Sequence, residues 1–254
     1  MRSVTGRALK VLDAFSVERT HLSLSEISRY AGLPMATTHR LVAELAAWGA
    51  LERGSDGKYG IGLRLWEVGA LAPRGLGLRE VAMPFLEDLY EATHENVQLA
   101  VLDGLEVVYV ERIFGRDAVD VFSRVGARWP AHATGVGLVL LAYATTEVQE
   151  RYLAAPLTAF TEKTIVDAAR LRRVLADVRR TGIAVSDRQV TLDAMSVAAP
   201  VRGAANEVVA ALSIIVRAGT VQPMPLAAAV VTAARGISRA LREPGGRPRP
   251  SQSR

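Results

Sequence analysis

The stretch from Ser23 to Trp48 contains two amphipathic segments on either side of a Gly-Leu-Pro turn. Apolar residues recur in both segments at three- and four-residue spacing, which predicts two short helices that each bury one face. These residues are Leu24, Ile27 and Ala31 in the first segment and Leu41, Val42 and Leu45 in the second. Two short helices joined by a tight glycine-bearing turn are typical of a helix-turn-helix.

The second of these predicted helices begins with the residues Met-Ala-Thr-Thr-His-Arg, from Met35 to Arg40. Small and hydroxylated side chains suit insertion into the major groove of DNA, where hydroxyls meet phosphates and Arg reaches base edges. A segment just N-terminal to the motif, with apolar residues from Val4 to Phe15 on one helical face, predicts a supporting helix. An ordinary helical hairpin within a core is the alternative interpretation.

A predicted β-hairpin follows directly, with Leu51-Glu52-Arg53 and Lys58-Tyr59-Gly60 flanking an Asp-Gly turn. A hairpin at this position is typical of a wing, which places its two basic residues beside the phosphate backbone. A solvated hairpin without function is the alternative. The predicted DNA contacts of the whole segment are Arg7, Ser25, Thr37, Thr38, Arg40, Arg53 and Lys58.

The charge of the chain is unevenly distributed. The net charge is +5. Residues 1–66 carry nine Lys and Arg against six Asp and Glu, residues 67–242 carry nineteen of each sign, and residues 243–254 carry three Arg and one Glu. A basic excess at the predicted DNA-binding end agrees with phosphate binding.

Composition narrows the class of protein. The chain contains no cysteine, so it forms neither disulfides nor thiolate metal sites. No apolar run approaches about 18 residues and no N-terminal signal pattern is present, so we expect a cytoplasmic protein that does not associate with membranes.

From about residue 93 the pattern changes to short apolar strands. A strong hairpin signal surrounds Asp103-Gly104, and helices are expected at 134–144, 168–180 and 226–241. The arginines of the 168–180 helix alternate with acids and indicate a solvated face. The predicted strands cover residues 97–102, 106–111, 119–125, 183–186, 196–201 and 208–216. We therefore expect an α+β domain whose central sheet is antiparallel and which can hold a small-molecule pocket.

The predicted organisation has four parts. We expect residues 1–66 to form the winged helix-turn-helix, 67–92 a linker and connecting helix, 93–242 the α+β domain with its small-molecule pocket, and 243–254 a disordered tail.

Motifs for catalysis are missing from the sequence. It has no G-x-S-x-G elbow, P-loop or H-E-x-x-H motif, and its four histidines lack ligand spacing. We expect no catalytic residues, no metal and no cofactor. Two alternatives to a DNA-binding function remain open: an enzyme acting on a small metabolite, with Ser186, Ser196 and His132 as its candidate groups, and an adaptor whose winged helix binds a protein.

The chain resembles the IclR family of bacterial transcriptional regulators from about Ser3 to Leu241. The segments that carry the resemblance are RALKVLDAF from Arg7, GLPMATTHRLVAEL from Gly32, KYGIGLRLWEVG from Lys58, HATGVGLVLLA from His132 and GIAVSDRQVTLDAMSVAAPV from Gly182. The resemblance implies a GAF-like effector domain, assembly as a dimer or dimer of dimers, and binding of double-stranded operator DNA. It also implies a repressor of a catabolic or metabolic operon whose DNA affinity is altered by a small-molecule effector.

In this family the effector is often a small organic or aromatic acid. The resemblance places it at the start of the 134–144 helix, where free N–H groups and the helix dipole favour an anion. The implied effector contacts are His132, Gly135, Val136, Ser186 and Ser196. A structural role for the glycines and serines, and for His132, is the alternative.

The sequence departs from the family pattern at several positions. Ser186 and Gln189 stand where many relatives have acidic residues, which makes metal or cation binding in the pocket less favourable. Met35-Ala36 replaces a frequent basic-hydroxyl pair in the recognition helix and leaves Thr37, Thr38 and Arg40 as the better DNA contacts.

Overall fold

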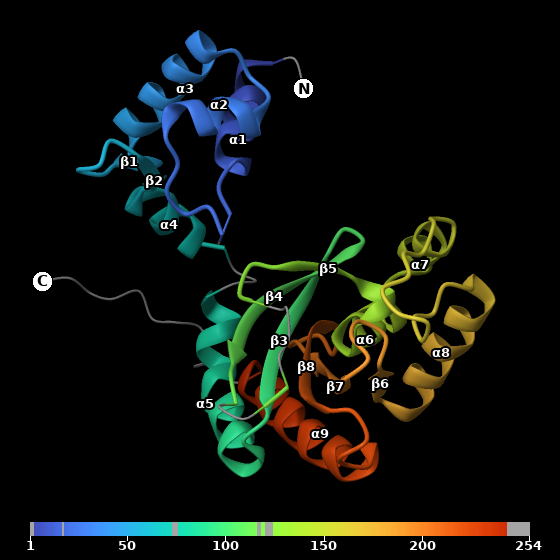
Figure 1. The fold of residues 1–254 in the computed structure, drawn as a ribbon. Coiled ribbons are helices and arrows are strands. Elements are labelled where there is room, and N and C mark those ends of the chain that lie inside the picture. The colour runs from blue at the N-terminus through green and yellow to red at the C-terminus, as the bar shows by residue number, and fades with distance from the viewer. Residues whose placement is uncertain (1–2, 17, 73–75, 116–117, 120–123, 243–254) are drawn as a thin grey trace, which may run out of the picture. The chain divides into compact units, whose positions relative to one another are not determined.

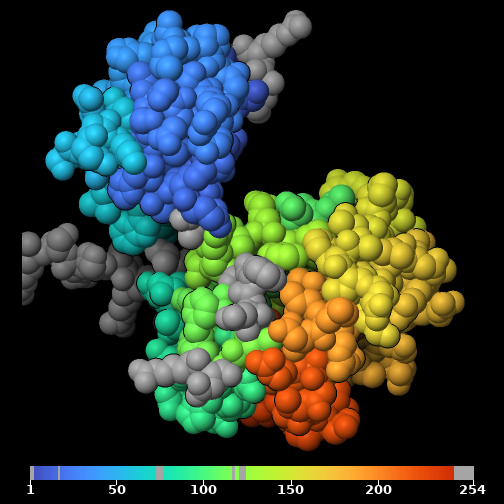
Figure 2. Space-filling view, viewed as in Figure 1, coloured from blue at the N-terminus to red at the C-terminus, as the bar shows by residue number. Residues whose placement is uncertain are grey.

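The computed structural model describes residues 3–16, 18–72, 76–115, 118–119 and 124–242. The contacts within the chain divide it into two compact units, Met1–Leu76 and Gly77–Arg254. Figure 1 shows the ribbon of both units, and Figure 2 shows the atoms that reach the surface of each one.

The N-terminal unit is a bundle of helices with a two-stranded hairpin. Its elements are α1 (Val4–Asp13), α2 (Leu24–Ala31), α3 (Met35–Trp48), β1 (Leu51–Arg53), β2 (Tyr59–Ile61) and α4 (Leu63–Ala70). Its core contains Val11, Ala14, Leu22, Ile27, Leu41, Val42 and Leu51. The predicted helix-turn-helix and wing are therefore confirmed as α2, α3 and the β1–β2 hairpin.

Local chemistry determines where α2 and α3 begin and end. Ser23 and Glu26 form a reciprocal capping box at the start of α2, in which the Ser23 N–H donates to Glu26 Oε2 at 2.8 Å. Gly32 ends α2 in the left-handed conformation, with φ of 62°. Pro34 then precedes α3, where its fixed φ is compatible with a helix start. The turn between the helices thus follows from residue types that were visible in the sequence.

The C-terminal unit is built around one sheet of six strands. The sheet contains β3 (Asn96–Asp103), β4 (Glu106–Ile113), β5 (Arg128–Pro130), β6 (Ala184–Asp187), β7 (Ala194–Arg202) and β8 (Val208–Arg217), in the order β5-β4-β3-β8-β7-β6. Every neighbouring pair is antiparallel. The expected α+β domain with a central antiparallel sheet is confirmed.

Helices cover both faces of this sheet (Figure 1). Those of the unit are α5 (Leu76–Thr93), α6 (Gly135–Ala142), α7 (Thr146–Leu153), α8 (Ala168–Thr181) and α9 (Pro223–Ala240). One core lies between the sheet and α5 with α9, and a second lies between the sheet and α6 with α8. All eight residues of α6 are buried, so this helix forms the inner wall of the second core.

Two sequence expectations lie partly or wholly outside the described residues. Within 67–92, predicted as a linker and connecting helix, α4 reaches Ala70 and α5 packs Ala82 and Leu86 into the core of the C-terminal unit. The predicted strand 119–125 falls largely on residues 120–123, which lie outside the described residues; the described strand that pairs with the outer side of β4 is β5. The predicted tail 243–254 also lies outside them.

The arginines of α8 are all exposed, as the prediction of a solvated face requires. No helix among the described residues is both long and apolar enough to cross a membrane.

Candidate DNA-binding surface and effector cavity

The start of α3 presents exposed side chains to solvent. Met35, Ala36, His39 and Arg40 are exposed, and Thr37 is partly exposed. The Arg40 guanidinium lies 2.7 Å from a carboxylate oxygen of Glu44, one turn further along the helix. An exposed pair at this spacing stabilises a helix by only about 0.3–0.5 kcal/mol. Arg40 can therefore exchange Glu44 for a phosphate or a base edge at small cost.

Thr38 does not belong to this surface, which corrects the sequence prediction. Its exposed fraction is 0%. Its hydroxyl donates to the carbonyl oxygen of Pro34 at 3.1 Å, one turn earlier. Thr38 therefore stabilises the first turn of α3 from the core side, where the helical period places it with Leu41 and Val42.

The wing carries two exposed basic residues, Arg53 and Lys58. Between them the Lys58 N–H donates to Asp56 Oδ1 at 3.1 Å, and Gly57 adopts a φ of 79°. These features hold the turn between β1 and β2 and leave both cations in solvent.

The two remaining predicted DNA contacts differ from each other. Ser25 is exposed at the start of α2. Arg7 is partly buried in α1, and its Nε is buried without an acceptor among the described residues. Arg7 is thus the less accessible of the two.

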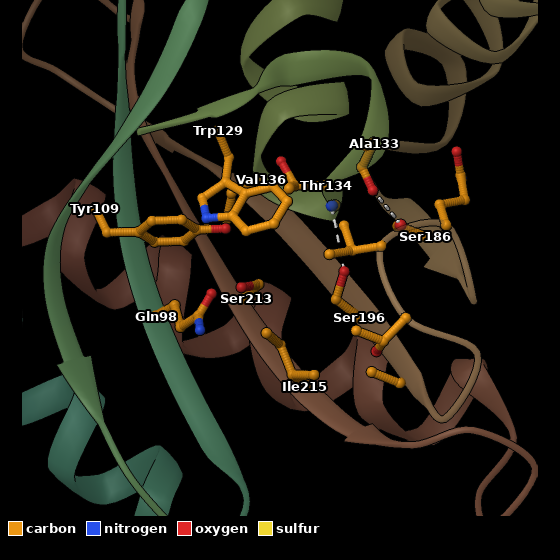
Figure 3. Close-up of a pocket in the computed structure, with 15 residues that line it drawn as sticks. Gln98, Tyr109, Trp129, Ala133, Thr134, Val136, Ser186, Ser196, Ser213 and Ile215 are labelled. Atoms are coloured by element: carbon orange, nitrogen blue, oxygen red, sulfur yellow. Dashed lines mark hydrogen bonds between the residues drawn. The ribbon is translucent and has the colours of Figure 1, made fainter. Parts of the chain in front are cut away.

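A cavity lies between the sheet and the N-terminus of α6 in the C-terminal unit (Figure 3). The empty space inside it, counted together with its open mouth, is about 530 Å³. The predicted residues Gly135, Val136, Ser186 and Ser196 all line it. Tyr109 and Trp129 lie toward one side of the cavity in Figure 3 and Ser186 toward the other.

The sheet supplies a row of buried polar side chains to the cavity. Gln98 on β3 is paired with Ser213 on β8, and Ser196 on β7 is paired with Ser186 on β6. These four residues are at most 8% exposed. Antiparallel register brings them to one face, because side chains alternate along each strand.

The N-terminus of α6 offers its backbone N–H groups to this row. The Gly135 N–H donates to Ser196 Oγ at 3.2 Å, and the Gly137 N–H donates to Thr134 Oγ1 at 3.1 Å. In the part of the chain that the structure describes, no acceptor meets the Val136 N–H. Because the first turn of a helix carries partial positive charge, this N–H is suited to an anionic oxygen.

The loop after β6 forms part of the cavity wall. The Ser186 hydroxyl donates to the Ala133 carbonyl oxygen at 2.8 Å, and the Thr164 hydroxyl donates to the Gln189 carbonyl oxygen at 2.7 Å. Thr191 Oγ1 is buried in the lining and has no hydrogen-bond partner among the described residues.

The lining is uncharged. None of the described residues that line the cavity carries a formal charge. Burial raises the pKa of the Tyr109 phenol above its usual range, and the phenol forms a hydrogen bond with the Thr134 side chain, so it adds no charge to the lining at physiological pH.

His132 does not line the cavity, which corrects its assignment as an effector contact. Its Nδ1 lies 2.8 Å from the Tyr152 hydroxyl and its Nε2 lies 3.0 Å from the Thr158 carbonyl oxygen. Burial lowers the pKa of the ring. His132 is a structural residue with both nitrogens satisfied.

Sequence reasoning missed Gln98, Tyr109, Trp129, Thr191 and Ser213 as lining residues. Gln98 and Ser213 carry a recognisable signal, since each is a polar residue inside an apolar strand. Tyr109 and Trp129 carry no such signal, because aromatic residues in strands are ordinarily part of a core.

The serines of the cavity lack what a nucleophile needs. Ser186 bonds to the Ala133 carbonyl and Ser196 to the Gly135 N–H. Among the described residues, neither hydroxyl bonds to an imidazole, amine or carboxylate that would activate it. The geometry favours binding over catalysis.

Comparison with known proteins agrees with this division of the chain. The IclR helix-turn-helix domain matches residues 4–55, and the C-terminal domain of bacterial transcriptional regulator IclR matches residues 72–239.

Individual relatives cover most of the chain. The crystal structure of an IclR homolog from Microbacterium hydrocarbonoxydans, complexed with 4-hydroxybenzoate, is 39% identical and covers 94% of this chain and 99% of its own, with a TM-score of 0.91. The HTH-type transcriptional regulator XynR of Escherichia coli is 34% identical over 82% of this chain and 83% of its own length. The transcriptional repressor IclR of Escherichia coli is 30% identical over 82% and 77%. The chain therefore belongs to the IclR family of bacterial transcriptional regulators and is a ligand-responsive, DNA-binding regulator rather than an enzyme.

Proposed function

We propose that the effector is a small aromatic carboxylic acid whose carboxylate lies at the N-terminus of α6. The observation that carries this proposal is the Val136 N–H, which is left without an acceptor in an otherwise uncharged cavity. A helix N-terminus favours a single negative charge by its dipole and its free N–H groups. A dianion would need a cation that this lining does not contain.

The remainder of the lining suits a ring with one further polar substituent. Trp129, Val190 and Ile215 contribute apolar surface, and Gln98, Tyr109 and Ser213 contribute groups that form hydrogen bonds. The related protein from Microbacterium hydrocarbonoxydans was solved with 4-hydroxybenzoate, which has this composition. Within this proposal Gly135, Val136, Ser186 and Ser196 surround the bound acid, and His132 does not touch it.

The proposed action of the effector is to alter affinity for an operator that controls a metabolic operon. Relatives named as repressors, including the acetate operon repressor of Salmonella typhimurium, support repression. Arg40, Thr37, Arg53, Lys58 and Ser25 are the proposed contacts. We also propose a dimer or a dimer of dimers, because two recognition helices about 34–36 Å apart can read two half-sites.

Calorimetry on the full chain tests the effector class. 4-Hydroxybenzoate is expected to bind at one site per chain, and 4-hydroxybenzamide, which has nearly the same shape but no charge, at least tenfold more weakly. Equal affinity for the two compounds would refute a carboxylate at the α6 N-terminus.

Fluorescence anisotropy with labelled DNA tests the regulatory action. The protein is expected to prefer a fragment from upstream of its own gene over a random duplex of equal length, and 4-hydroxybenzoate is expected to shift that affinity. Light scattering after size exclusion gives the oligomeric state. An absence of preference for upstream DNA would contradict operator binding.

A further inference from the structure

A second hollow of the C-terminal unit lies between β7, α9 and the ends of α6 and α8. It measures about 990 Å³, counting its open mouth. Small residues, including Gly182, Ala199 and Ala234, line it and leave it unfilled. We define this hollow as the arginine groove, because four arginines line it: Arg202, Arg235, Arg239 and Arg242.

Two of these arginines lie on α9, and a third follows just after the helix ends. Arg235 and Arg239 are four residues apart, and Arg242 follows three residues later, just beyond the end of the helix at Ala240. Like charges at this spacing destabilise a helix. None of the described residues that line the groove is acidic, and the Glu207 carboxylate, in the adjoining turn, lies against Gly203 instead.

Two of the guanidinium groups are held in place by the turn after β7. Arg202 Nη1 donates to the Asn206 carbonyl oxygen at 2.9 Å, and its guanidinium lies 5.0 Å from the centre of the Tyr143 ring. Arg242 Nη2 donates to Asn206 Oδ1 at 3.0 Å. Preorganised guanidinium groups lose less entropy when they bind an anion.

The other two arginines are exposed, and neither has a side-chain acceptor among the described residues. Interaction with the helix dipole accounts for a cation only in the last turn. That explanation covers Arg239 and Arg242 but not Arg235, which lies more than one turn before the end of α9, nor Arg202, which lies on a strand. The cluster is therefore more than a helix cap.

The arginine groove differs from the effector cavity in position and in charge. The cavity lies at Gly135, where α6 begins, and the groove includes Tyr143, where α6 ends. Eight helical residues separate the two by about 12 Å along the axis. The cavity is lined by neutral groups, whereas four cations line the groove, so the two sites select ligands of different charge.

We propose that the arginine groove binds a phosphorylated small molecule, with a pyrophosphate or comparable multiply charged phosphate group held between Arg202 on β7 and the arginines of α9. Guanidinium groups match phosphate oxygens in pairs of parallel hydrogen bonds. Four cations exceed what a single carboxylate neutralises, whereas a pyrophosphate group carries several negative charges.

Calorimetry of the full chain with sodium pyrophosphate tests this site. The wild-type protein is expected to show saturable binding of one pyrophosphate per chain. The double variant Arg235→Gln/Arg239→Gln is expected to raise the dissociation constant at least tenfold. Both side chains are exposed, so this change leaves the core intact.

The matched control is Arg170→Gln/Arg173→Gln, which removes the same charge from exposed positions on α8. It is expected to change pyrophosphate affinity less than twofold, and binding of 4-hydroxybenzoate is expected to survive in both double variants. An absence of saturable binding to the wild type, or equal losses in the two double variants, would overturn the proposal.

Two competitors distinguish the ligand class. Succinate is expected to bind at least tenfold more weakly than pyrophosphate, and a random DNA duplex is expected not to displace pyrophosphate. Equal affinity for succinate would overturn the assignment to phosphate, and displacement by DNA would instead assign the groove to the DNA backbone.

Discussion

The Oγ of Ser196 accepts a hydrogen bond from the backbone N–H of Gly135 at 3.2 Å, although 61 residues separate them in the chain. This contact joins β7 to the first turn of α6. A Cβ atom at Gly135 would lie 2.5 Å from the same oxygen, so a larger residue at this position would force the Ser196 hydroxyl to move. In the proposed complex, the effector carboxylate would meet the Val136 N–H directly and would reach the Gly135 N–H only by replacing the Ser196 hydroxyl.

Substitution of Ser196 is expected to separate effector binding from DNA binding. Ser196→Leu introduces a branched side chain into the cavity and should weaken 4-hydroxybenzoate binding by about 100-fold or more in calorimetry. Ser196→Ala keeps the space and removes one hydrogen bond, which is worth about 0.5–1.5 kcal/mol, so its affinity should stay within about tenfold. Operator affinity of both variants should remain within about threefold. An unchanged effector response in Ser196→Leu would remove this residue from the site.

Gly137 is expected to be the α6 glycine that tolerates substitution least. A Cβ atom there would overlap the backbone of Ala131, including its carbonyl oxygen. Because backbone cannot move aside as a flexible side chain can, Gly137→Ala should lower the free energy of unfolding by about 2–4 kcal/mol.

The matched control is Gly69→Ala in α4, where a Cβ atom meets nothing within 4 Å. This change should stabilise the N-terminal unit by about 0.5–1 kcal/mol. Urea unfolding followed by circular dichroism measures both variants, and equal stability of Gly137→Ala and wild type would contradict the close packing of α6 on Ala131.

Removal of the Arg40 side chain is expected to weaken operator binding. A contact from Arg to a base edge contributes about 1–3 kcal/mol, so Arg40→Ala should raise the operator dissociation constant by about 5- to 150-fold at fixed salt. Lys58→Ala should instead weaken specific and random DNA about equally and reduce the salt slope by about one.

Thr38→Val is the control for this helix, because the Thr38 hydroxyl faces Pro34 rather than solvent. Its operator affinity should stay within about threefold of wild type. A large and operator-specific loss in Thr38→Val, with the fold intact, would restore Thr38 to the DNA-binding surface.

Stability is expected to fall in mildly acidic solution because of His132. Burial lowers the pKa of His132 in the folded state below its ordinary value of about 6.5. The unfolded chain then binds more protons at this residue than the folded chain does. The contribution of His132 to the free energy of unfolding is therefore fully present above about pH 6.5 and is lost as the pH falls toward the folded-state pKa.

Urea unfolding at pH 7.5 and pH 5.0 measures this effect. The loss in the free energy of unfolding between the two pH values should be smaller in His132→Gln than in wild type. The control is His39→Gln, an exposed position on α3, which should lose as much unfolding free energy as wild type. An identical loss in His132→Gln and wild type would assign the pH dependence to other groups.

The helix-turn-helix and most of the sheet are predictable from the chain because their signals are local. The capping pair Ser23 and Glu26, the glycine at position 32 and the Asp-Gly turns act within a few residues. Apolar periodicity then indicates which face of each element is buried. The order of the family motifs along the chain further indicates that an N-terminal part binds DNA and a C-terminal part binds the effector.

Local sequence signals do not determine whether an individual side chain is buried or which site it faces. Thr38 shares its residue type with Thr37, and only the packing of α3 on the core of the N-terminal unit decides that Thr38 is buried. His132 precedes the cavity helix, yet Tyr152 and Thr158 hold its ring away from the cavity lining.

The sequence by itself determined the family, the recognition helix, the wing and the antiparallel character of the sheet. The tertiary structure alone decided that Gln98 and Ser213 face one cavity, that Ser196 meets Gly135, and that Arg202 lies at the same groove as the arginines of α9. The physical reason is distance along the chain. Strand register and the packing of helices on a sheet bring together residues whose identities carry no information about one another until the chain is folded.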